Sequence, residues 1–416
     1  MTVTRRIGLS LGADLCWPIF YEDILARLDP VVRVGGKDVR FEVERVTIEP
    51  FDLRQPSRYD VVLDRLTPWY HTSREWLKKS MVHDRTYLLN NPFTLQAMQK
   101  HTSYAAMMRL GLPVPDTWLL PPRDYDHHPD LDVTLERYAQ MFDLRGLGDR
   151  LGYPLYLKPY DGGAWEGVSR IEDGEALQAA YDASGTRIMH LQKAAEPYDL
   201  FVRVLGVGPQ TTVIRYEPSL PLHDRYRVDF HFVDADEWAL LGDLALTINS
   251  FFGWEFNSVE AVRHAGEFQP IDFANANPDS QVTSLHYHIP WLVKALIRWS
   301  LFCAATDRPM DPDLHWDRYQ EIADADLPYR DKLRLYAELG RRRFEADRFE
   351  EFSAGQLGDL DEVALDYFSE PGVRDTIRWK VSSMYPAHEV EHFTDHFHGL
   401  IRFWTHTERD RLDAGG

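Results

Sequence analysis

The first part of the chain, residues 1–85, alternates between strand-like and helix-like spacing of apolar positions. RIGLSL and YDVVLDRL contain short apolar runs, VRFEVERVTI alternates with period two, and PIFYEDILARL has helical spacing. Strands that alternate with helices usually form a parallel sheet with crossover helices. The pattern therefore predicts an α/β domain whose first strand covers 7–11.

The pattern changes after residue 90. NPFTLQAMQKHTSYAAMMRLGL predicts a helix that begins at a proline and ends at Gly111. LPVPDTWLL has the pattern of an extended segment. The next segment, PPRDYDHHPDLD, is polar and rich in proline and aspartate, which is typical of a surface insertion or connection.

The remaining chain is first strand-rich, over 153–280, and then helical from His286 to Arg411. The predicted strands lie in YPLYLKPY, RIMHLQKAA, LFVRVLGVG, TTVIRYEP, RYRVDFHFV, VEAVRHAG and FQPIDFANA. A chain of 416 residues is too long for one compact core. We expect an N-terminal domain over 1–90, a central domain over 91–305 with subdomains that meet near residue 190, and a helical extension over 306–416.

The composition limits the classes of partner. The formal charge is −20, from 66 acidic and 46 basic residues. A field of this sign repels nucleic acids and anionic lipids, so we expect neither as a partner. An anionic ligand would need a local basic pocket.

Two cysteines and the absence of a long apolar run indicate the compartment. Cys16 and Cys303 are too few for a disulfide framework, which fits a reducing environment. No apolar run approaches the roughly 20 residues of a membrane helix. We therefore expect a cytoplasmic protein.

One lysine lies just ahead of a glycine-rich segment. In YPLYLKPYDGGAWEGV, Lys158 closes an apolar run, and Gly162, Gly163 and Gly167 follow. Glycines let backbone N–H groups approach an anion closely, so the segment could form a hairpin that covers phosphates. A plain β-hairpin with a loose turn is the alternative.

Two later segments suit other parts of a nucleotide. MHLQKAAEPYDLFVRVLG has an irregular break between two strands, whose backbone could pair with an adenine edge, and Asp199 could meet ribose hydroxyls. Glu260, Asp272 and Asn275 lie on or near a predicted hairpin, and oxygen ligands of this kind suit Mg²⁺. An ordinary connection and an Asp–Arg ion pair are the alternatives.

In this order, the motifs resemble the ATP-grasp superfamily of carboxylate–amine ligases, which includes ribosomal-protein glutamate ligase, D-alanine–D-alanine ligase and glutathione synthetase. The run covers residues 60–305 and comprises NP before a helix with Lys100, GLPVPDT, YLKPYDGGAWEGV, Gln192-Lys193 before DLFVRVLGVG, and Glu260 ahead of IDFANANPD. The resemblance implies an ATP-grasp fold preceded by an α/β pre-ATP-grasp domain. The helical extension lies outside the shared fold.

The resemblance also implies roles for individual residues. Lys158 and Arg203 would be catalytic, with Arg203 facing the triphosphate and Arg215 assisting at the phosphate or the acyl substrate. Glu260, Asp272 and Asn275 would hold Mg²⁺ or Mn²⁺. The implied ATP-binding residues are Lys100, Lys158, Gly162, Gly163, Ala164, Trp165, Gln192, Lys193, Ala194, Ala195, Glu196 and Asp199.

The sequence departs from the family pattern at three places. Asp272 lies three residues before Asn275, where the family has two, so either the strand end bulges or Asn277 takes part. Gln192 stands where many members have glutamate. Trp165 and Glu166 are large for a loop usually built from small residues, so they would either shield the site from water or mark an altered lid.

The implied chemistry joins two small molecules, a carboxylate and an amine, through an acyl phosphate made from ATP. An amino acid or a peptide is the expected substrate. A degenerate ATP-grasp protein that only binds nucleotide, as a scaffold or regulator, is the main alternative. The helical extension could pack on the ligase core, form a homodimer contact or cover the substrate side.

A rival motif, AHEVEHF, contains the His-Glu-x-x-His spacing of zinc peptidases. On a helix, His388 and His392 would share one face, and His396 would extend it, with His398 nearby. A preceding proline, Pro386, indicates that His388 lies in the first turn of the helix. A structural or partner-facing histidine stripe is the other interpretation.

Overall fold

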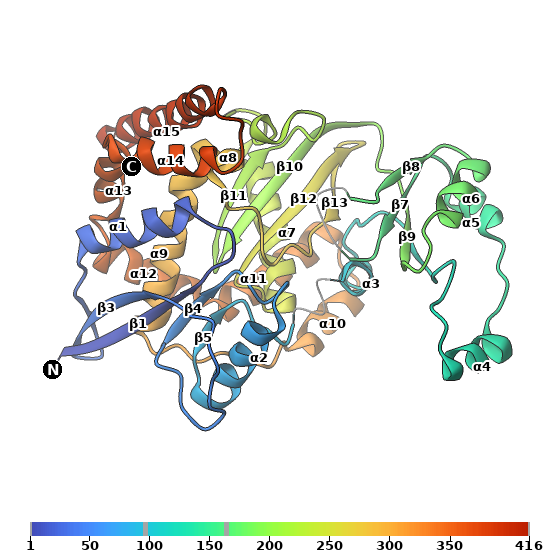
Figure 1. Cartoon of the computed structure of the whole chain (residues 1–416), viewed down its shortest axis with the longest axis horizontal. Coiled ribbons are helices and arrows are strands. Elements are labelled where there is room, and N and C mark those ends of the chain that lie inside the picture. Colours follow the sequence, from blue (N-terminus) through green and yellow to red (C-terminus); the bar gives the residue numbers. More distant parts are fainter. Residues whose placement is uncertain (1, 95–98, 162–165, 415–416) are drawn as a thin grey trace. The chain divides into compact units, whose positions relative to one another are not determined.

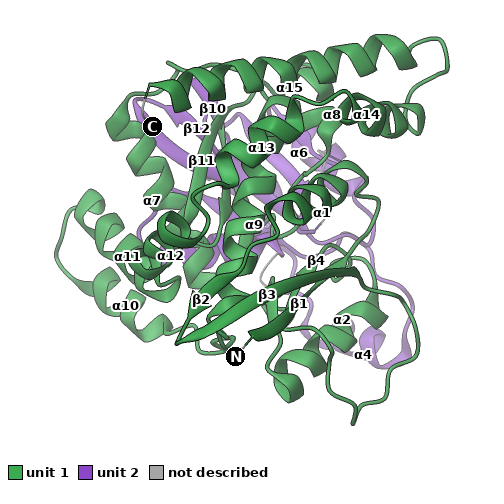
Figure 2. Cartoon of the chain, turned by 90° about the vertical axis from the view of Figure 1, so that its left-hand side faces the viewer, with its two compact units in different colours: residues 1–95, 202–258, 275–416 green, residues 96–201, 259–274 purple. Residues whose placement is uncertain are grey.

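The computed structural model describes residues 2–94, 99–161 and 166–414 (Figure 1). Its chain divides into two compact units (Figure 2). Unit 1 comprises 1–95, 202–258 and 275–416, and unit 2 comprises 96–201 and 259–274. Neither unit is one continuous stretch of sequence, and the division into 1–90, 91–305 and 306–416 stays a prediction.

The N-terminal sheet of unit 1 has the strand order β2-β3-β1-β4-β5. The strands β1 (Thr2–Ser10), β3 (Lys37–Arg45), β4 (Val61–Asp64) and β5 (Tyr87–Leu89) are parallel, and β2 (Val32–Val34) is an antiparallel edge. The helix α1 (Cys16–Leu28) connects β1 to β2, and α2 (His71–Lys79), continued by a π-helical turn at Ser80–Asp84, precedes β5. The predicted α/β class is confirmed, although β1 begins at Thr2 rather than at residue 7.

A second sheet has the order β11-β10-β12-β13, built from β10 (Tyr198–Val207), β11 (Gln210–Arg215), β12 (Phe256–His264) and β13 (Glu267–Asp272). The strand predicted in RYRVDFHFV is wrong. Within this segment, residues 225–233, only Tyr226 pairs, as an isolated bridge to Tyr216, and a short 3-10 turn at Leu222–Asp224 precedes it. The helix α7 (Ala235–Phe252) follows instead, because Asp234 and Glu237 form a capping box at its start.

Unit 2 contains an antiparallel sheet with the order β6-β9-β7-β8. Its strands are β6 (Thr117–Leu120), β7 (Leu155–Pro159), β8 (Ser169–Ile171) and β9 (Met189–Lys193). The helices α5 (Leu144–Leu151) and α6 (Gly174–Asp182) cover one face (Figure 1), where leucines from both helices and from the strands form a buried core. The expected hairpin around the glycine-rich segment is therefore present as β7 and β8.

Two further helices of unit 2 depart from the sequence pattern. The helix α3 (Lys100–Arg109) begins at Lys100, and not at Pro92, which lies in a turn. It ends as predicted, since Gly111 has the left-handed φ of 79° that suits a residue just after a helix. The helix α4 (Pro129–Tyr138) of the polar insertion has no buried residue and stands away from the sheet of unit 2 (Figure 1).

The two faces of the unit 2 sheet differ in chemistry. Met189 and Leu191 of β9 point into the core beneath α5 and α6. Alternation along a strand therefore directs His190 and Gln192 to the other face, and Lys158 is the register partner of His190. A lysine, a histidine and a glutamine thus share the face opposite the leucine core.

The chain after residue 281 is helical, which confirms the helical C-terminal region. Its central helix, α9 (Ile289–Ala305), is buried along nearly its whole length. None of the helices among the described residues is both long and apolar enough to cross a membrane. The other elements are α8 (Val282–Leu285), a 3-10 turn at His286–His288, α10 (Trp316–Asp324), α11 (Tyr329–Arg343), α12 (Ala346–Gln356), α13 (Leu360–Phe368), α14 (Gly372–Ser382) and α15 (Val390–Asp413).

Candidate functional site

The ammonium of Lys158 lies buried within unit 2 and is held by neutral groups. Its Nζ donates to Tyr104 Oη at 2.8 Å, to Gln192 Oε1 at 2.8 Å and to the Ile271 carbonyl at 3.2 Å. An ammonium has three N–H donors, so these bonds use all of them. A hydroxyl, an amide and a carbonyl carry no net charge, so these partners leave the positive charge of Lys158 uncompensated.

The surroundings of Lys158 lower the pKa of its ammonium group. The pKa of the Lys158 ammonium is lowered to about 7, chiefly by burial and in addition by the charge of Lys100. The carboxylates of Asp272 and Glu260 act in the opposite direction. An anion bound beside Lys158 would add to their effect and favour the charged ammonium.

The second lysine, Lys100, begins α3 and pairs with a carboxylate of β13. Its Nζ lies 2.7 Å from Asp272 Oδ2, and the two side chains are 10% and 22% exposed. Burial acts to lower the pKa of Lys100, but the neighbouring Asp272 outweighs it, and the pKa is raised. Lys100 is therefore positively charged at neutral pH.

The carboxylates predicted to hold a metal lie opposite each other. Glu260 of β12 and Asp272 of β13 are register partners, and the next pair joins Ala261 to Pro270, so Ile271 is an extra residue on β13. The residue added in such a bulge leaves the regular ladder. This bulge lies before Asp272 and not between Asp272 and Asn275, so the choice between a bulge and Asn277 as the reason for the unusual Asp272–Asn275 spacing stays a prediction.

The two carboxylates suit a divalent ion, and Asp272 already binds the cation Lys100. Asn275 belongs to unit 1, where its backbone N–H donates to Asn257 Oδ1 at 2.9 Å. Asn277 donates from Nδ2 to the Arg65 carbonyl at 3.2 Å. No group of three or more His, Cys, Asp or Glu side chains in the described part of the chain has the geometry of a metal site.

The segment predicted to bind adenine, residues 192–195, forms hydrogen bonds with other residues of unit 2. Gln192 donates from Nε2 to Thr117 Oγ1 at 2.7 Å, in addition to its bond with Lys158. The backbone N–H groups of Lys193 and Ala194 donate to the carbonyls of Asp116 and Pro154. Ala195 follows them and is 9% exposed.

Asp199, which is predicted to bind ribose, and Glu196, the alternative for that role, are each hydrogen-bonded to an arginine. Glu196 accepts from Arg170 at 2.8 Å and from Tyr156 Oη at 2.6 Å. Asp199 accepts from Arg263 at 3.0 Å. The bonds from Arg170 and Arg263 lower the pKa of Glu196 and Asp199, respectively, so both carboxyl groups are ionised and can accept hydrogen bonds.

The tip of the predicted lid lies outside the described residues. This applies to Gly162, Gly163, Ala164 and Trp165. The hairpin resumes at Glu166, which is exposed, and at Gly167, whose φ of 71° favours glycine. The covering role of this loop stays a prediction.

The two arginines proposed for catalysis lie in unit 1 and point to opposite faces of one ladder. Arg203 donates to Tyr226 Oη and lies 5.5 Å from the centroids of both the Tyr216 and Tyr226 rings. Arg215 is the register partner of Val202, so its side chain points away from that of Arg203. It pairs with Glu217 at 3.0 Å and Asp229 at 2.9 Å.

The zinc-peptidase arrangement is not formed. The helix α15 begins at Val390, so His388 precedes the helix and does not share a helical face with His392. The His388 side chain is 80% exposed, whereas His396 packs 6.1 Å from the ring of His223. The two histidines of the motif therefore lack the shared helical face of a zinc peptidase, and His396 contributes to aromatic packing.

Two residues of the Lys158 environment were not predicted from the sequence. Tyr104 is 2% exposed, and its position four residues after Lys100 on a helix could have indicated that both face the same site. His190 is fully buried with no hydrogen-bond partner at either ring nitrogen. No motif marks His190, because nothing in its local sequence distinguishes it from a core position.

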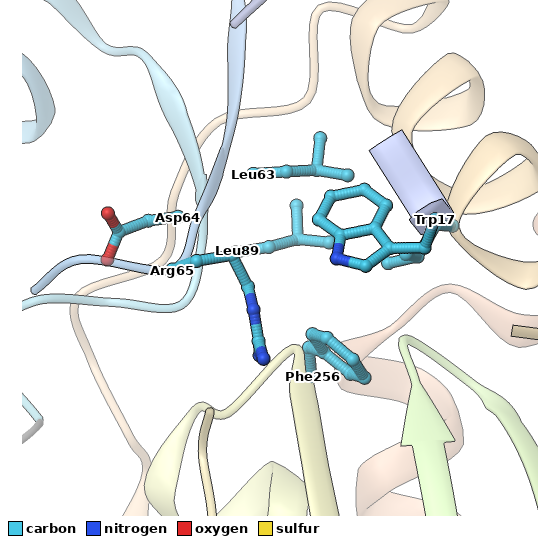
Figure 3. Close-up of a pocket in the computed structure, with 7 residues that line it drawn as sticks. Trp17, Leu63, Asp64, Arg65, Leu89 and Phe256 are labelled. Atoms are coloured by element: carbon cyan, nitrogen blue, oxygen red, sulfur yellow. The ribbon is translucent and has the colours of Figure 1, made fainter. Parts of the chain in front are cut away.

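Unit 1 contains a small pocket at the carboxyl end of β4 (Figure 3). The Arg65 side chain extends beside Phe256 and the Trp17 indole, whereas the Asp64 carboxylate points away from them. Arg65 donates to Asp14, Ser280 and the Pro278 carbonyl. The lining residues are Trp17, Leu63, Asp64, Arg65, Leu89, Phe256 and Leu296.

Comparisons with solved structures return ATP-grasp proteins. An ATP-grasp RimK domain protein from Sphaerobacter thermophilus is 16% identical and matches 66% of this chain and 92% of its own, with a TM-score of 0.44. D-alanine–D-alanine ligase from Bacillus anthracis is 13% identical over 82% and 99%, with a TM-score of 0.45. VanG D-Ala:D-Ser ligase from Enterococcus faecalis is 13% identical over 81% and 100%, with a TM-score of 0.45.

No protein-family model and no curated protein matches the sequence. The solved structures are of the kind that the sequence motifs resemble.

Proposed function

We propose that the protein is an ATP- and Mg²⁺-dependent ligase of the carboxylate–amine type within the ATP-grasp superfamily. One observation carries the proposal. Lys100, Lys158, Glu260 and Asp272 come from distant parts of the sequence, and unit 2 gathers them into one electrostatically coupled cluster. Two cations beside two carboxylates can serve a metal-bound triphosphate.

ATP is a substrate of the reaction, and each residue of the cluster has a separate role in binding it. Lys158 supplies a charge that its neutral partners leave uncompensated, and Lys100 adds a second charge. Glu260 and Asp272 would hold Mg²⁺, which would neutralise phosphate charge. Asp199, or Glu196 as the alternative, is an ionised acceptor for the ribose hydroxyls.

The chemistry needs no nucleophile from the protein. An oxygen of the substrate carboxylate bonds to the γ-phosphorus of ATP, and the bond to ADP breaks, which leaves an acyl phosphate and ADP. The amine nitrogen then bonds to the acyl carbon, phosphate departs with the carbon–oxygen electrons, and the nitrogen loses a proton. The protein contributes positioning, positive charge and the exclusion of water.

The proposed substrates are a small carboxylate and a small amine, one of them an amino acid or a peptide. We also propose a cytoplasmic location and a homodimer contact through the helical region. The roles of Arg203, Arg215, Asn275 and the lid glycines stay predictions from the resemblance.

The deciding experiment measures ADP release from MgATP in the presence of pooled amino acids and dipeptides. We expect release to rise at least about tenfold over the background without substrate, and the coupled product to contain a new amide by mass spectrometry. ADP release that no carboxylate–amine pair stimulates would contradict the ligase proposal.

One observation favours the alternative, a nucleotide-binding scaffold. Lys100 is bound to Asp272, and all three donors of Lys158 are used within unit 2. A protein of this second kind would bind ATP in the same assay without substrate-stimulated turnover. Calorimetric ATP binding with no ADP release would therefore select it.

A further inference from the structure

The hydroxyl of Tyr104 joins two parts of the proposed nucleotide site. It donates to the Ile271 carbonyl at 2.8 Å and accepts from Lys158 Nζ at 2.8 Å. Ile271 is the bulge residue immediately before Asp272. One phenol therefore connects the buried lysine of β7 to the strand that carries a metal-site carboxylate.

The bulge explains why this connection is possible. A residue added to one strand leaves the regular ladder, so its carbonyl can bond elsewhere. The Ile271 carbonyl accepts from both Tyr104 and Lys158. The bulge at Ile271 thus supplies a hydrogen-bond acceptor to Lys158, the lysine that we expect to contact phosphate.

The tyrosine itself is firmly held. Its ring packs edge-on against Phe273 and His190, with centroids 5.2 and 5.5 Å away, and Lys158 Nζ lies 4.9 Å from the ring centroid. Burial raises the pKa of the Tyr104 phenol well above its usual range, so the hydroxyl keeps its proton and can donate. The ring and the hydroxyl both favour a cation at this position.

The helix α3 delivers two consecutive contacts to β13. Lys100 and Tyr104 lie one turn apart on the same helical face, and they bond to the neighbouring residues Asp272 and Ile271. A buried phenol needs one partner to avoid an unsatisfied hydroxyl. Tyr104 has two, and one of them is the lysine that we expect to meet phosphate.

We propose that Tyr104 is a positioning residue of the nucleotide site, whose hydroxyl holds the Lys158 ammonium beside β13 ready for an anionic phosphate. This inference rests on the proposed function, because it assumes that a nucleotide is the anion. The charged and titratable groups around Lys158 are Lys100 on α3, His190 on β9, and the carboxylates Glu260 and Asp272.

The test compares Tyr104→Phe with Tyr181→Phe. Tyr181 is a matched control, because it is also buried in unit 2 and its hydroxyl donates to the Pro121 carbonyl at 2.9 Å, in the leucine core. The first measurement follows the ¹⁵N shift of the lysine ammonium groups against pH in protein without nucleotide, with Lys158→Met identifying the Lys158 signal. The second measures MgATP affinity by calorimetry.

We expect Tyr104→Phe to lower the titration midpoint of Lys158 by about one pH unit, since a hydrogen bond to a charged group is worth about that much. We expect its MgATP affinity to fall about tenfold for the same reason. Tyr181→Phe leaves both values at those of the wild type. A variant with 3-fluorotyrosine at position 104 retains the shape and hydroxyl, and gives a smaller shift of the same sign.

The outcomes of these measurements distinguish whether Tyr104 positions Lys158. A wild-type midpoint and affinity in Tyr104→Phe would overturn the role of Tyr104, and so would equal shifts in both Tyr→Phe variants. If Tyr104→Phe does not fold, an unshifted midpoint in the fluorotyrosine variant would overturn it. If the wild type does not bind MgATP, the proposed function fails, whereas a lowered Lys158 midpoint in Tyr104→Phe would still show that Tyr104 positions the lysine.

Discussion

Lys100 and Asp272 form a part-buried ion pair with 2.7 Å between Nζ and Oδ2, although 171 residues separate them in the chain. The pair joins the first residue of α3 to the last residue of β13. Lys100, which we propose to contact phosphate, thus lies against Asp272, which we propose to bind the metal. Binding of MgATP would therefore exchange this internal partner for phosphate and metal.

Replacing Asp272 by asparagine tests its place in the metal site. We expect Asp272→Asn to raise the Mg²⁺ concentration needed for half-maximal ATP turnover at least about tenfold, because an ionised oxygen ligand is replaced by a neutral one. Without nucleotide, the variant loses about 1–3 kcal/mol of stability, since Lys100 keeps its charge and loses its partner. Glu267→Gln, an exposed change at the start of the same strand, is the control. An unchanged Mg²⁺ dependence would remove Asp272 from the metal site.

Lys158 is the lysine on which the proposed reaction depends most. We expect Lys158→Met to reduce ATP turnover by at least about 100-fold, since the charge is lost at the position where phosphate charge develops. Methionine retains the length of the side chain, so the far-UV circular dichroism spectrum stays that of the wild type. Lys37→Met, at the exposed first residue of β3 in unit 1, keeps full turnover. Turnover in Lys158→Met close to that of the wild type would exclude Lys158 from the mechanism.

His190 makes the stability of unit 2 depend on pH. Burial lowers the pKa of its imidazole to about 3, and the charge of Lys158 contributes. The folded state binds a proton at His190 less readily than the unfolded state does. The free energy of unfolding of unit 2 is therefore highest above the unfolded pKa of about 6.5, and it decreases as pH falls towards 3. We expect a loss of roughly 3 kcal/mol between pH 6.5 and pH 4.

The measurement is hydrogen exchange of the β7 and β9 amides as a function of pH, corrected for intrinsic exchange. His190→Leu removes most of the pH dependence, whereas His128→Gln, an exposed change in the insertion, retains it. A His190→Leu variant with the slope of the wild type would show that other groups control the acid sensitivity.

Arg65 tests the stability of unit 1. Its guanidinium and the Asp14 carboxylate are 8% and 5% exposed, and Arg65 also donates to the loop after β13 through Ser280 and Pro278. Arg65→Ala leaves a buried carboxylate without its cation, which costs about 3–5 kcal/mol. Arg123→Ala, which breaks a half-exposed pair with Asp182, costs less than about 1 kcal/mol. Urea unfolding measures both, and equal losses would contradict the buried role of Arg65.

The sequence alone determined the element types and the order of the motifs. Period-two and helical spacing identified the parallel N-terminal sheet, the β7–β8 hairpin and the helical C-terminal region, because burial of one face imposes these periods locally. Local signals also misled. Pro92 does not begin α3, and the alternation in RYRVDFHFV was taken for a strand, although the capping pair Asp234 and Glu237 marks a helix just after it.

The tertiary structure decided which side chains meet. The sequence motifs identified Lys100, Lys158, Glu260 and Asp272 as candidates for binding ATP and metal. Only the tertiary structure brings α3, β7 and β13 together and shows that Tyr104 lies among them. It also directed Arg203 and Arg215 to opposite faces of one ladder and left His388 outside α15. The reason is physical: periodicity is set by neighbours within a few residues, whereas hydrogen bonds between distant segments depend on register and bulges that no local pattern encodes.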